Sequence, residues 1–394
     1  MDYTEFLRTK EVRDVPTGLT DIPELNPMLF DFQRDIVKWA LRRGRAAIFA
    51  DCGLGKTPMQ LEWAKHVPGN VLILAPLAVS AQTAREGRKF GVDVQHSRDG
   101  TIGGKVTITN YEQAHHIKPE DYTGIVLDES SILKNFTGKY RNYIIDSFRD
   151  TPWKLACTAT PAPNDYMELG NHAEFIGAMT RTEMLAMFFV HDGGSTQNWR
   201  LKGHAESEFW RWLCSWAVNI RQPSDLGYDN GKFILPPIHL HQHSVNTDAT
   251  GEFLFSIEAQ TLTERLAARR DTITARAEKC ADIVSKSNEP WLIWCNLNDE
   301  ASAVASMVDG AVNVQGSDKP DTKETELLRF SNGETRVLVT KPKIAGFGMN
   351  WQHCSNVAFV GLSDSWESYY PGSPAMLAVW SAEHRKRTYY HGRY

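Results

Sequence analysis

The sequence predicts an α/β protein divided into two lobes, each built around a parallel β-sheet. Two sets of short apolar runs, alternating with stretches of helical composition, indicate this fold class. A chain of 394 residues, 42% of them hydrophobic and 23% charged, is long enough to bury two sizeable cores. We therefore expect an N-terminal extension over residues 1–27, a first lobe over residues 28–175 and a second lobe over residues 236–370.

The first set of apolar runs predicts five buried strands. These runs are AAIFA (46–50), NVLILAP (70–76), KVTITN (105–110), GIVLDE (124–129) and KLACTAT (154–160). Segments of helical composition such as PMQLEWAKHV lie between them, which favours strands joined by helical crossovers and therefore parallel pairing. The second set predicts the strands of the second lobe, at PWLIWCN, AVNVQG, TRVLVTK and NVAFVGL.

The stretch between the two lobes, residues 176–235, is rich in tryptophan and phenylalanine and predicts a helical insertion. Four of its tryptophans recur at roughly helical spacing, which is typical of a hydrophobic core. The alternative is that these rings stack on nucleic-acid bases. The four are Trp199, Trp210, Trp212 and Trp216.

Charge and cysteine usage restrict the cellular setting. The formal net charge is -5, so any contact with nucleic acid must come from a local cationic surface. The six cysteines are scattered and form no C-x-x-C pair, which fits a reducing compartment. The N-terminal MDYTEFLRTKEV lacks the apolar core of a signal peptide, and no run approaches the ~18 apolar residues of a membrane span. We expect a cytoplasmic protein with no membrane contact, and the sequence does not identify which proteins it binds.

The segment ADCGLGKTPMQ follows the first predicted strand and precedes a predicted helix. Its glycines let backbone N–H groups surround a phosphate, Lys56 supplies a positive charge, and the Thr57 hydroxyl can ligate Mg²⁺. The full phosphate-loop pattern is missed at one position, where Ala50 replaces glycine, and a plain turn is the alternative. The predicted nucleotide-binding residues of this loop are Asp51, Cys52, Gly53, Leu54, Gly55, Lys56 and Thr57.

A second motif, GIVLDESSILKN, ends a predicted strand with two adjacent carboxylates. Ligands of α/β proteins bind at the carboxyl ends of the strands. Asp128 is expected to hold Mg²⁺ there, and Glu129 to orient the attacking water. Acid pairs at strand ends are often merely solvated, but this pair belongs to the same predicted sheet as the phosphate loop. Together with Lys56, the two carboxylates are the predicted catalytic residues.

Further segments give a specific resemblance to a known family. LFDFQRDIVKWAL, LILAPLAVSAQTAREGRKF, ITNYEQA, LDESSILKN, CTATPAPND and KPKIAGFGMNWQHCSNVAFVGLSDSWE, in this order, resemble the motifs of superfamily 2 helicases and translocases. The likeness is to the Swi/Snf-like branch, and especially to its compact phage and prophage members. It implies two RecA-like lobes, with Gln33 on the adenine base. It also implies a group of residues that couple hydrolysis to nucleic acid, namely Thr158, Thr160, Asn164, Lys341, Gly346 and Gly348.

The resemblance implies an ATP-dependent motor with ATP and Mg²⁺ as cofactors. ATP would bind between the lobes, and its hydrolysis would drive translocation along nucleic acid, which in this branch is double-stranded DNA. Strand separation is not implied. Ser130 and Ser131 depart from the family, which commonly has Ala or Cys and then His after the Asp-Glu pair.

The resemblance stops at Tyr370. Family members continue with a helix of the form Q-x-x-R-R-x-x-R-x-G-Q, whose arginines reach the γ-phosphate, whereas this chain continues with PGSPAMLAVWS. Pro371 and Pro374 disfavour a helix at this point. An arginine of this kind contributes about 10³ to 10⁵ in rate in well-studied NTPases. A competing function is therefore an ATP- and DNA-binding protein with little turnover.

The genetic code suggests a reason for the change. With one base fewer at codon 371, the codons available to PGSPAMLAVWS permit Gln-Ala-Val-Arg-Arg-Cys-Trp-Arg-Phe-Gly-Gln, which is the missing motif in register. We therefore hypothesise a one-base insertion near this codon, which makes residues 371–394 an out-of-frame tail. A genuine divergent tail is the alternative.

Overall fold

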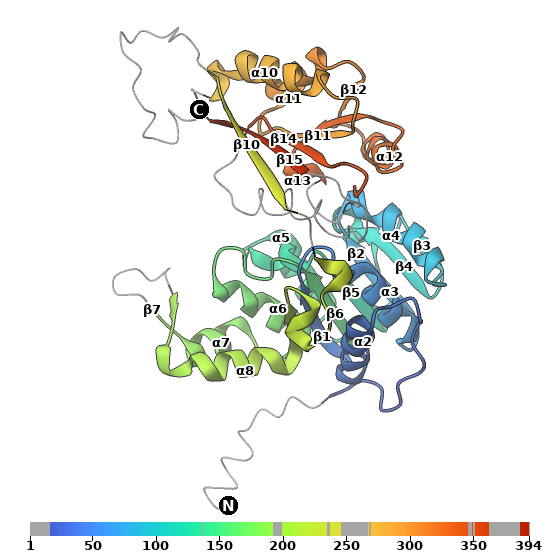
Figure 1. Ribbon diagram of the computed structural model, residues 1–394. Coiled ribbons are helices and arrows are strands. Elements are labelled where there is room, and N and C mark those ends of the chain that lie inside the picture. The colour runs from blue at the N-terminus through green and yellow to red at the C-terminus, as the bar shows by residue number, and fades with distance from the viewer. Residues whose placement is uncertain are drawn as a thin grey trace, which may run out of the picture. The chain divides into compact units, whose positions relative to one another are not determined.

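The computed structural model consists of two compact α/β units (Figure 1). It describes residues 16–135, 137–191, 199–234, 237–245, 267, 269–345, 349, 351–361 and 387–393. The first unit ends at Asp229 and the second begins at Asn230, except that residues 77–82 group with the second. Within these described ranges, no helix has the length and apolar character needed to cross a membrane.

Seven parallel strands form the sheet of the first unit. Their order is β3 (Val94–His96), β4 (Val106–Asn110), β2 (Val71–Ala75), β5 (Gly124–Asp128), β6 (Trp153–Thr158), β1 (Arg45–Ala50) and β9 (Ala217–Ile220). The strands predicted in the first lobe are confirmed as β1, β2, β4, β5 and β6. They were recognisable because both faces of these strands are buried, so each is an almost continuous apolar run.

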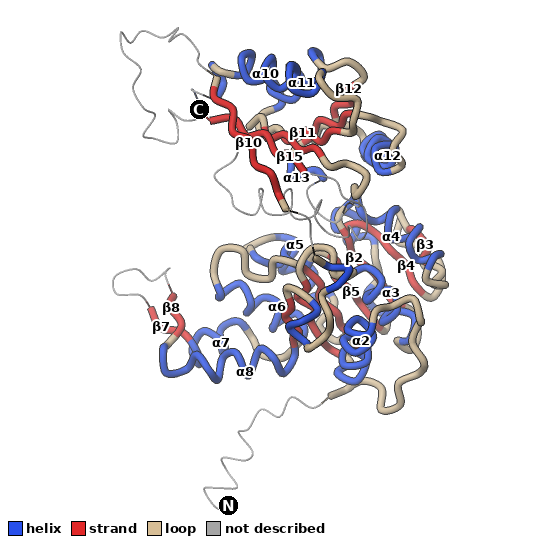
Figure 2. The backbone as a smooth tube through the Cα atoms, in the orientation of Figure 1, coloured by secondary structure: helices blue, strands red, loops and turns tan. Residues whose placement is uncertain are grey.

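Helices lie in most of the connections between these parallel strands (Figure 2), whereas residues 97–105 join β3 to β4 without one. Those of the first unit before the tryptophan-rich stretch are α2 (Asp31–Arg43), α3 (Lys56–His66), α4 (Leu77–Lys89), α5 (Lys139–Ser147) and α6 (Leu169–Ile176). Short 3₁₀ turns follow two strands, at Tyr111–His116 after β4 and at Ser130–Lys134 after β5. Residues before α2 also pack on this unit: Gly18 N–H donates to Arg42 O over 3.1 Å, and Leu25 is buried.

The tryptophan-rich stretch supplies helices, as predicted, and strands as well. It contains α7 (Arg181–Phe188), the antiparallel pair β7 (Phe189–His191) and β8 (Trp199–Leu201), α8 (Glu206–Trp216) and the sheet strand β9. Trp216 is fully buried, with its ring edge-on to Phe49 at 6.1 Å. Trp199, Trp210 and Trp212 are partly buried against the same core, so the core interpretation is confirmed.

The second unit contains another parallel sheet. Its strand order is β10 (Ile238–Ser244), β15 (Arg387–Arg393), β14 (Asn356–Phe359), β11 (Trp291–Trp294), β13 (Val337–Thr340) and β12 (Ala311–Asn313). The four predicted strands of this lobe are confirmed as β11 to β14. Its helices are α10 (Ile273–Ser285), α11 (Asn298–Met307), α12 (Pro320–Ser331) and α13 (Pro342–Ala345).

The predicted tail contributes one described element. Strand β15 pairs in parallel with β10 on one side and β14 on the other. Residues 371–386, where the missing arginine helix would begin, lie outside the described residues. The frame hypothesis therefore stays a prediction, and any account of the tail has to supply a strand at this place in the sheet.

A buried ion pair joins two helices of the second unit to the end of β14. Arg276 of α10 pairs with Glu300 of α11, and both side chains are almost fully buried. The Arg276 guanidinium also donates to the carbonyl of Val360, while the Glu300 carboxylate accepts from Asn296 N over 2.7 Å. Because buried charges require such partners, this network fixes how the two helices pack beside the strand.

Candidate functional site

Three predicted motifs meet at one edge of the first sheet. The phosphate loop follows β1, the carboxylates of Asp128 and Glu129 follow β5, and Thr158 ends β6. These strands are consecutive in the sheet, in the order β5, β6, β1. Since all three are parallel, their carboxyl ends lie at the same edge, where α/β folds bind ligands.

The loop between β1 and α3 has a backbone that depends on glycine. Gly53 and Gly55 have φ of 84° and 76°, in the left-handed region, and Gly55 is the residue before the first turn of α3. Asp51 N–H donates to Ile220 O over 3.0 Å, which ties the start of the loop to β9. The loop therefore leads directly into a helix N-terminus, whose free N–H groups favour anions.

Lys56 lies in the first turn of α3, beside the acidic residues. Its Nζ donates to Ala50 O over 3.0 Å, within the loop itself. Burial lowers the pKa of the Lys56 ammonium, but the nearby carboxylates of Glu129, Asp128 and Asp51 outweigh it, so the pKa is raised. The ammonium thus stays charged, and its charge lowers the pKa of both predicted catalytic acids, Asp128 and Glu129.

Asp128 is held from two sides. Its Oδ1 accepts a 2.7 Å hydrogen bond from Gln60 Nε2 of α3, and its backbone carbonyl accepts one of 2.7 Å from the Tyr111 hydroxyl. The side chain is buried, and burial raises the pKa of its carboxyl, whereas the bond from Gln60 and the charge of Lys56 lower it. The Asp128 carboxylate is therefore held against α3, the helix that begins at the end of the phosphate loop.

Glu129 has a strained backbone. Its φ and ψ are both 55°, and in the described part of the chain it is the one non-glycine residue with positive φ. Its Oε2 accepts from Thr158 Oγ1 over 3.2 Å, and that hydroxyl accepts from Thr160 N over 3.1 Å. Burial raises the pKa of the Glu129 carboxyl; Lys56 lowers it, and Asp128 raises it further. Non-glycine residues in this region cost ~1–3 kcal/mol and occur mainly at functional sites.

Gln33 lies against the phosphate loop. Its Nε2 donates to Leu54 O over 2.8 Å, and its Oε1 accepts from Phe30 N over 3.0 Å. A Cβ at Gly55 would be 2.3 Å from Gln33 Nε2, so a larger residue would displace the Gln33 amide, and the positive φ favours glycine in any case. In this structure Gln33 links α2 to the loop; its expected contact with an adenine base stays a prediction.

The residues present are compatible with Mg²⁺. The carboxylate of Asp128 and the hydroxyl of Thr57 are the oxygen ligands that Mg²⁺ prefers. Among the described residues, one side chain is shown to hydrogen-bond to the Asp128 carboxylate: the amide of Gln60 donates to Oδ1. Burial raises the pKa of the neighbouring Cys52 thiol to about 11, so this thiol is protonated near neutral pH.

The structure describes four of the residues predicted to couple hydrolysis to nucleic acid. Thr158 and Thr160 lie at the carboxyl edge of the first sheet, as above. Asn164 is exposed, and its Nδ2 donates to Glu168 Oε1 over 2.8 Å. Lys341 follows β13 in the second unit. Gly346 and Gly348 lie outside the described residues.

Sequence reasoning missed three residues that support the site. Gln60 and Tyr111 hold Asp128, and buried His172 lies with Nε2 3.1 Å from Ser130 Oγ. Gln60 carried a weak signal, because it is a polar residue one helical turn after Lys56 and so lies on the same face of the predicted helix. Tyr111 and His172 carried none, since only the folded chain brings them near.

No protein-family model matches the chain, and no curated protein sequence is significantly similar to it. Solved structures are similar. The SWI2/SNF2 ATPase core of Sulfolobus solfataricus, in complex with dsDNA, has a TM-score of 0.47 and 14% identity, with 95% of this chain and 90% of that chain covered. A fragment of a putative HsdR subunit of a type I restriction enzyme from Vibrio vulnificus YJ016 has a TM-score of 0.54 and 13% identity, with 92% of this chain covered.

The chain spans 62% of the HsdR fragment, less than two thirds of its length. At 13% identity this likeness shows the fold alone. The fold is that of two RecA-like lobes with parallel sheets, as the sequence predicts.

Proposed function

We propose that this chain is an ATP-hydrolysing motor that translocates along double-stranded DNA. The observation that carries the proposal is the meeting of Lys56, Asp128 and Glu129 at the carboxyl ends of β1 and β5, two parallel strands that have only β6 between them. This is the set of groups that phosphoryl transfer requires, namely a phosphate cradle, a metal-binding carboxylate and a water-orienting carboxylate. The choice of DNA as the partner rests on the sequence motifs.

Each residue has a defined role in this proposal. The N–H groups of the phosphate loop and the Lys56 ammonium bind the phosphates, and Asp128 with Thr57 would hold Mg²⁺. When bound, Mg²⁺ supplies positive charge to the phosphate oxygens. Glu129 accepts a hydrogen bond from the attacking water, and the raised pKa of its carboxyl suits a group that takes up a proton.

A second candidate function is binding of ATP and DNA with little turnover. The observation that favours it is the sequence after Tyr370, where PGSPAMLAVWS stands in place of an arginine-bearing helix. The two functions predict the same nucleotide site and differ in rate, because an arginine at the γ-phosphate acts on the transition state.

Phosphate release by the purified chain, measured with ATP and Mg²⁺, tests the proposal. We expect stimulation by linear duplex DNA, with single-stranded DNA and duplex RNA as comparisons. Lys56→Ala should abolish turnover, since the structure shows no other cation beside both carboxylates in the described residues. Circular dichroism should show that this variant remains folded. ATP binding without stimulated release would select the second candidate, and unchanged turnover in Lys56→Ala would refute the site.

A further inference from the structure

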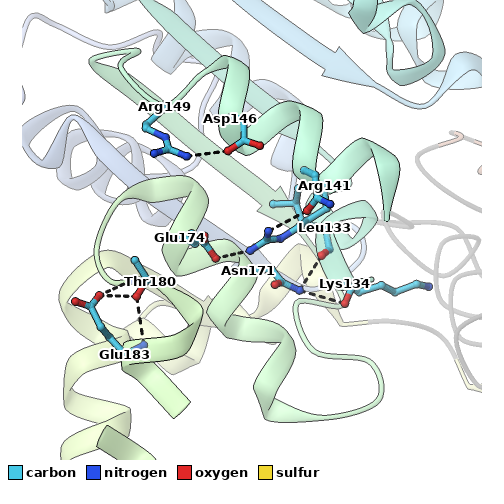
Figure 3. Close-up of polar contacts among 10 residues, drawn as sticks. Leu133, Lys134, Arg141, Asp146, Arg149, Asn171, Glu174, Thr180 and Glu183 are labelled. Carbon is cyan, nitrogen blue, oxygen red and sulfur yellow. Dashed lines mark hydrogen bonds and ion pairs between the residues drawn. The ribbon is translucent and has the colours of Figure 1, made fainter. Parts of the chain in front are cut away.

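Two neighbouring residues of α6 hold both ends of the turn that follows Glu129. At the beginning of the Ser130–Lys134 turn, His172 Nε2 lies 3.1 Å from Ser130 Oγ. At its end, Asn171 Nδ2 donates to Leu133 O over 2.8 Å and to Lys134 O over 3.1 Å, as Figure 3 shows. The turn is therefore attached to a helix that starts 39 residues after Ser130, from Leu169 on.

Helix α6 is itself anchored. Arg141 of α5 pairs with Glu174, on the next turn of α6 after Asn171, and Arg141 Nη1 also donates to Asn142 Oδ1 over 3.0 Å (Figure 3). Arg141 is largely buried and Glu174 is partly exposed, so this partly buried ion pair favours one arrangement of its two helices. A fixed α6 can hold the turn in a fixed place.

The turn needs such support because of the residue before it. Glu129 adopts a left-handed conformation that costs ~1–3 kcal/mol, and such a conformation persists only where its surroundings enforce it. Ser130, the next residue, is fully buried, and its hydroxyl is the side-chain group directly adjacent to the strained peptide. A contact that fixes Ser130 therefore also limits the backbone angles available to Glu129.

His172 suits this role. Its ring is fully buried and stands edge-on to Phe49, with ring centroids 5.2 Å apart and an interplanar angle of 82°. Phe49 is the second-last residue of β1, two residues before Asp51 of the phosphate loop. The imidazole thus lies between the strand that leads into the loop and the turn that follows Glu129. Burial lowers the pKa of His172 to about 4, so the ring is neutral near neutral pH.

We propose that His172 is a positioning residue for ATP hydrolysis: through Ser130 it keeps Glu129 in the backbone conformation that directs its carboxylate. This inference rests on the proposed function. A residue that only fills the core would affect stability and leave the catalytic rate of folded enzyme unchanged. A positioning residue instead lowers kcat, because misplacement of a group that acts in the transition state leaves substrate binding intact.

The test compares kcat and KM for ATP among single-residue variants of the full chain. His172→Phe keeps the aromatic contact with Phe49 and removes the polar end of the ring. We expect kcat to fall about tenfold, equivalent to ~1.4 kcal/mol, with KM changed by less than about twofold. His172→Gln, which can place a polar group near Nε2, should recover part of kcat. His204→Phe, the same change at an exposed histidine, is the matched control.

Ser130→Ala removes the same contact from the other side by deleting one oxygen atom. Because this change is small and leaves His172 in place, it tests the contact independently of any folding defect in His172→Phe. It should reproduce the loss of kcat, and the double variant with His172→Phe should lose no more than either single variant. With an active parent chain, unchanged kcat in Ser130→Ala and in folded His172→Phe would refute the positioning role alone. No phosphate release from the parent would refute the proposed function itself, and additive losses would refute the path through Ser130.

Discussion

The stability of the first unit should depend on pH through His172, and the size of the effect follows from its burial. An imidazole in water has a pKa near 6.5, whereas burial in the fold lowers the pKa of His172 to about 4. The folded state therefore favours the neutral ring, and the unfolded chain binds the proton more tightly. The stabilisation is fully present above pH 6.5 and is lost as the pH falls from there to about 4.

The magnitude can be worked out from these two pKa values. At ~1.36 kcal/mol for each pH unit, the difference between 6.5 and about 4 amounts to ~3 kcal/mol in total. Between pH 7 and pH 5 the loss should be about 2 kcal/mol, because most of the unfolded chains are then protonated and most of the folded molecules are not.

The assay is urea unfolding of the parent and of His172→Phe between pH 7 and pH 5. Hydrogen-exchange mass spectrometry on peptides from β1 and β5 reports the unfolding of the first unit. Other groups titrate in this range, so the relevant quantity is the difference between parent and variant at each pH. This difference should shrink by about 2 kcal/mol toward pH 5, and His172→Gln should behave like His172→Phe because glutamine does not titrate. A difference that stays constant would show that the imidazole is protonated as readily in the fold as in water, and would refute the reasoning from burial.

Three further predictions concern catalysis, the second unit and the tail. Glu129→Gln should bind a fluorescent ATP analogue at least as well as the parent while losing phosphate release, because the change removes a transition-state role and leaves Lys56 in place. Loss of binding together with turnover would show that Glu129 does not have the water-orienting role assigned to it. Glu300→Gln should destabilise the second unit by about 3–5 kcal/mol in urea unfolding, because it leaves the buried charge of Arg276 without its carboxylate. A double variant with Arg276→Met should regain part of that loss. Equal stability of the parent and Glu300→Gln would contradict the buried pair. Deleting one base at codon 371 should raise DNA-stimulated ATP hydrolysis by about 10³-fold or more if the restored arginines act at the γ-phosphate, and equal rates would mean that the tail is genuine.

The parts of the fold that the sequence predicts are those with a local signal. Strands β1, β2, β4, β5 and β6 are runs of apolar residues buried on both faces, and the phosphate loop depends on glycines a few residues apart. Strands β3 and β9 are the two edge strands of the sheet and are only partly buried, so neither is a continuous apolar run. Strand β15 lies in a segment whose sequence matches no pattern of the family.

The supporting shell of the site was not predictable for a different reason. Gln60 meets Asp128 across 68 residues of sequence, and His172 meets Ser130 across 42. Nothing near either residue in the sequence identifies its partner, because the pairing arises from the strand order and from the packing of α3 and α6. Residue type gave some information at Asp128 and Glu129, where the side chains themselves carry the chemistry, and little at the neutral groups that hold them.

Some of the hydrogen bonds that order the phosphate loop must be broken when a nucleotide binds. Lys56 Nζ donates to Ala50 O, and the Gln33 amide donates to Leu54 O, so two groups predicted to contact ATP are already satisfied by the loop. When ATP binds, a phosphate oxygen would replace the neutral carbonyl of Ala50 as the partner of Lys56. This exchange replaces one hydrogen bond with a stronger one between two charged groups, and the ammonium keeps a partner throughout. Gln33 gains no charge in such an exchange, and its present bonds tie α2 to the loop. The adenine end should therefore contribute less to affinity than the phosphate end, and the Lys56 loop should dominate the binding of ATP.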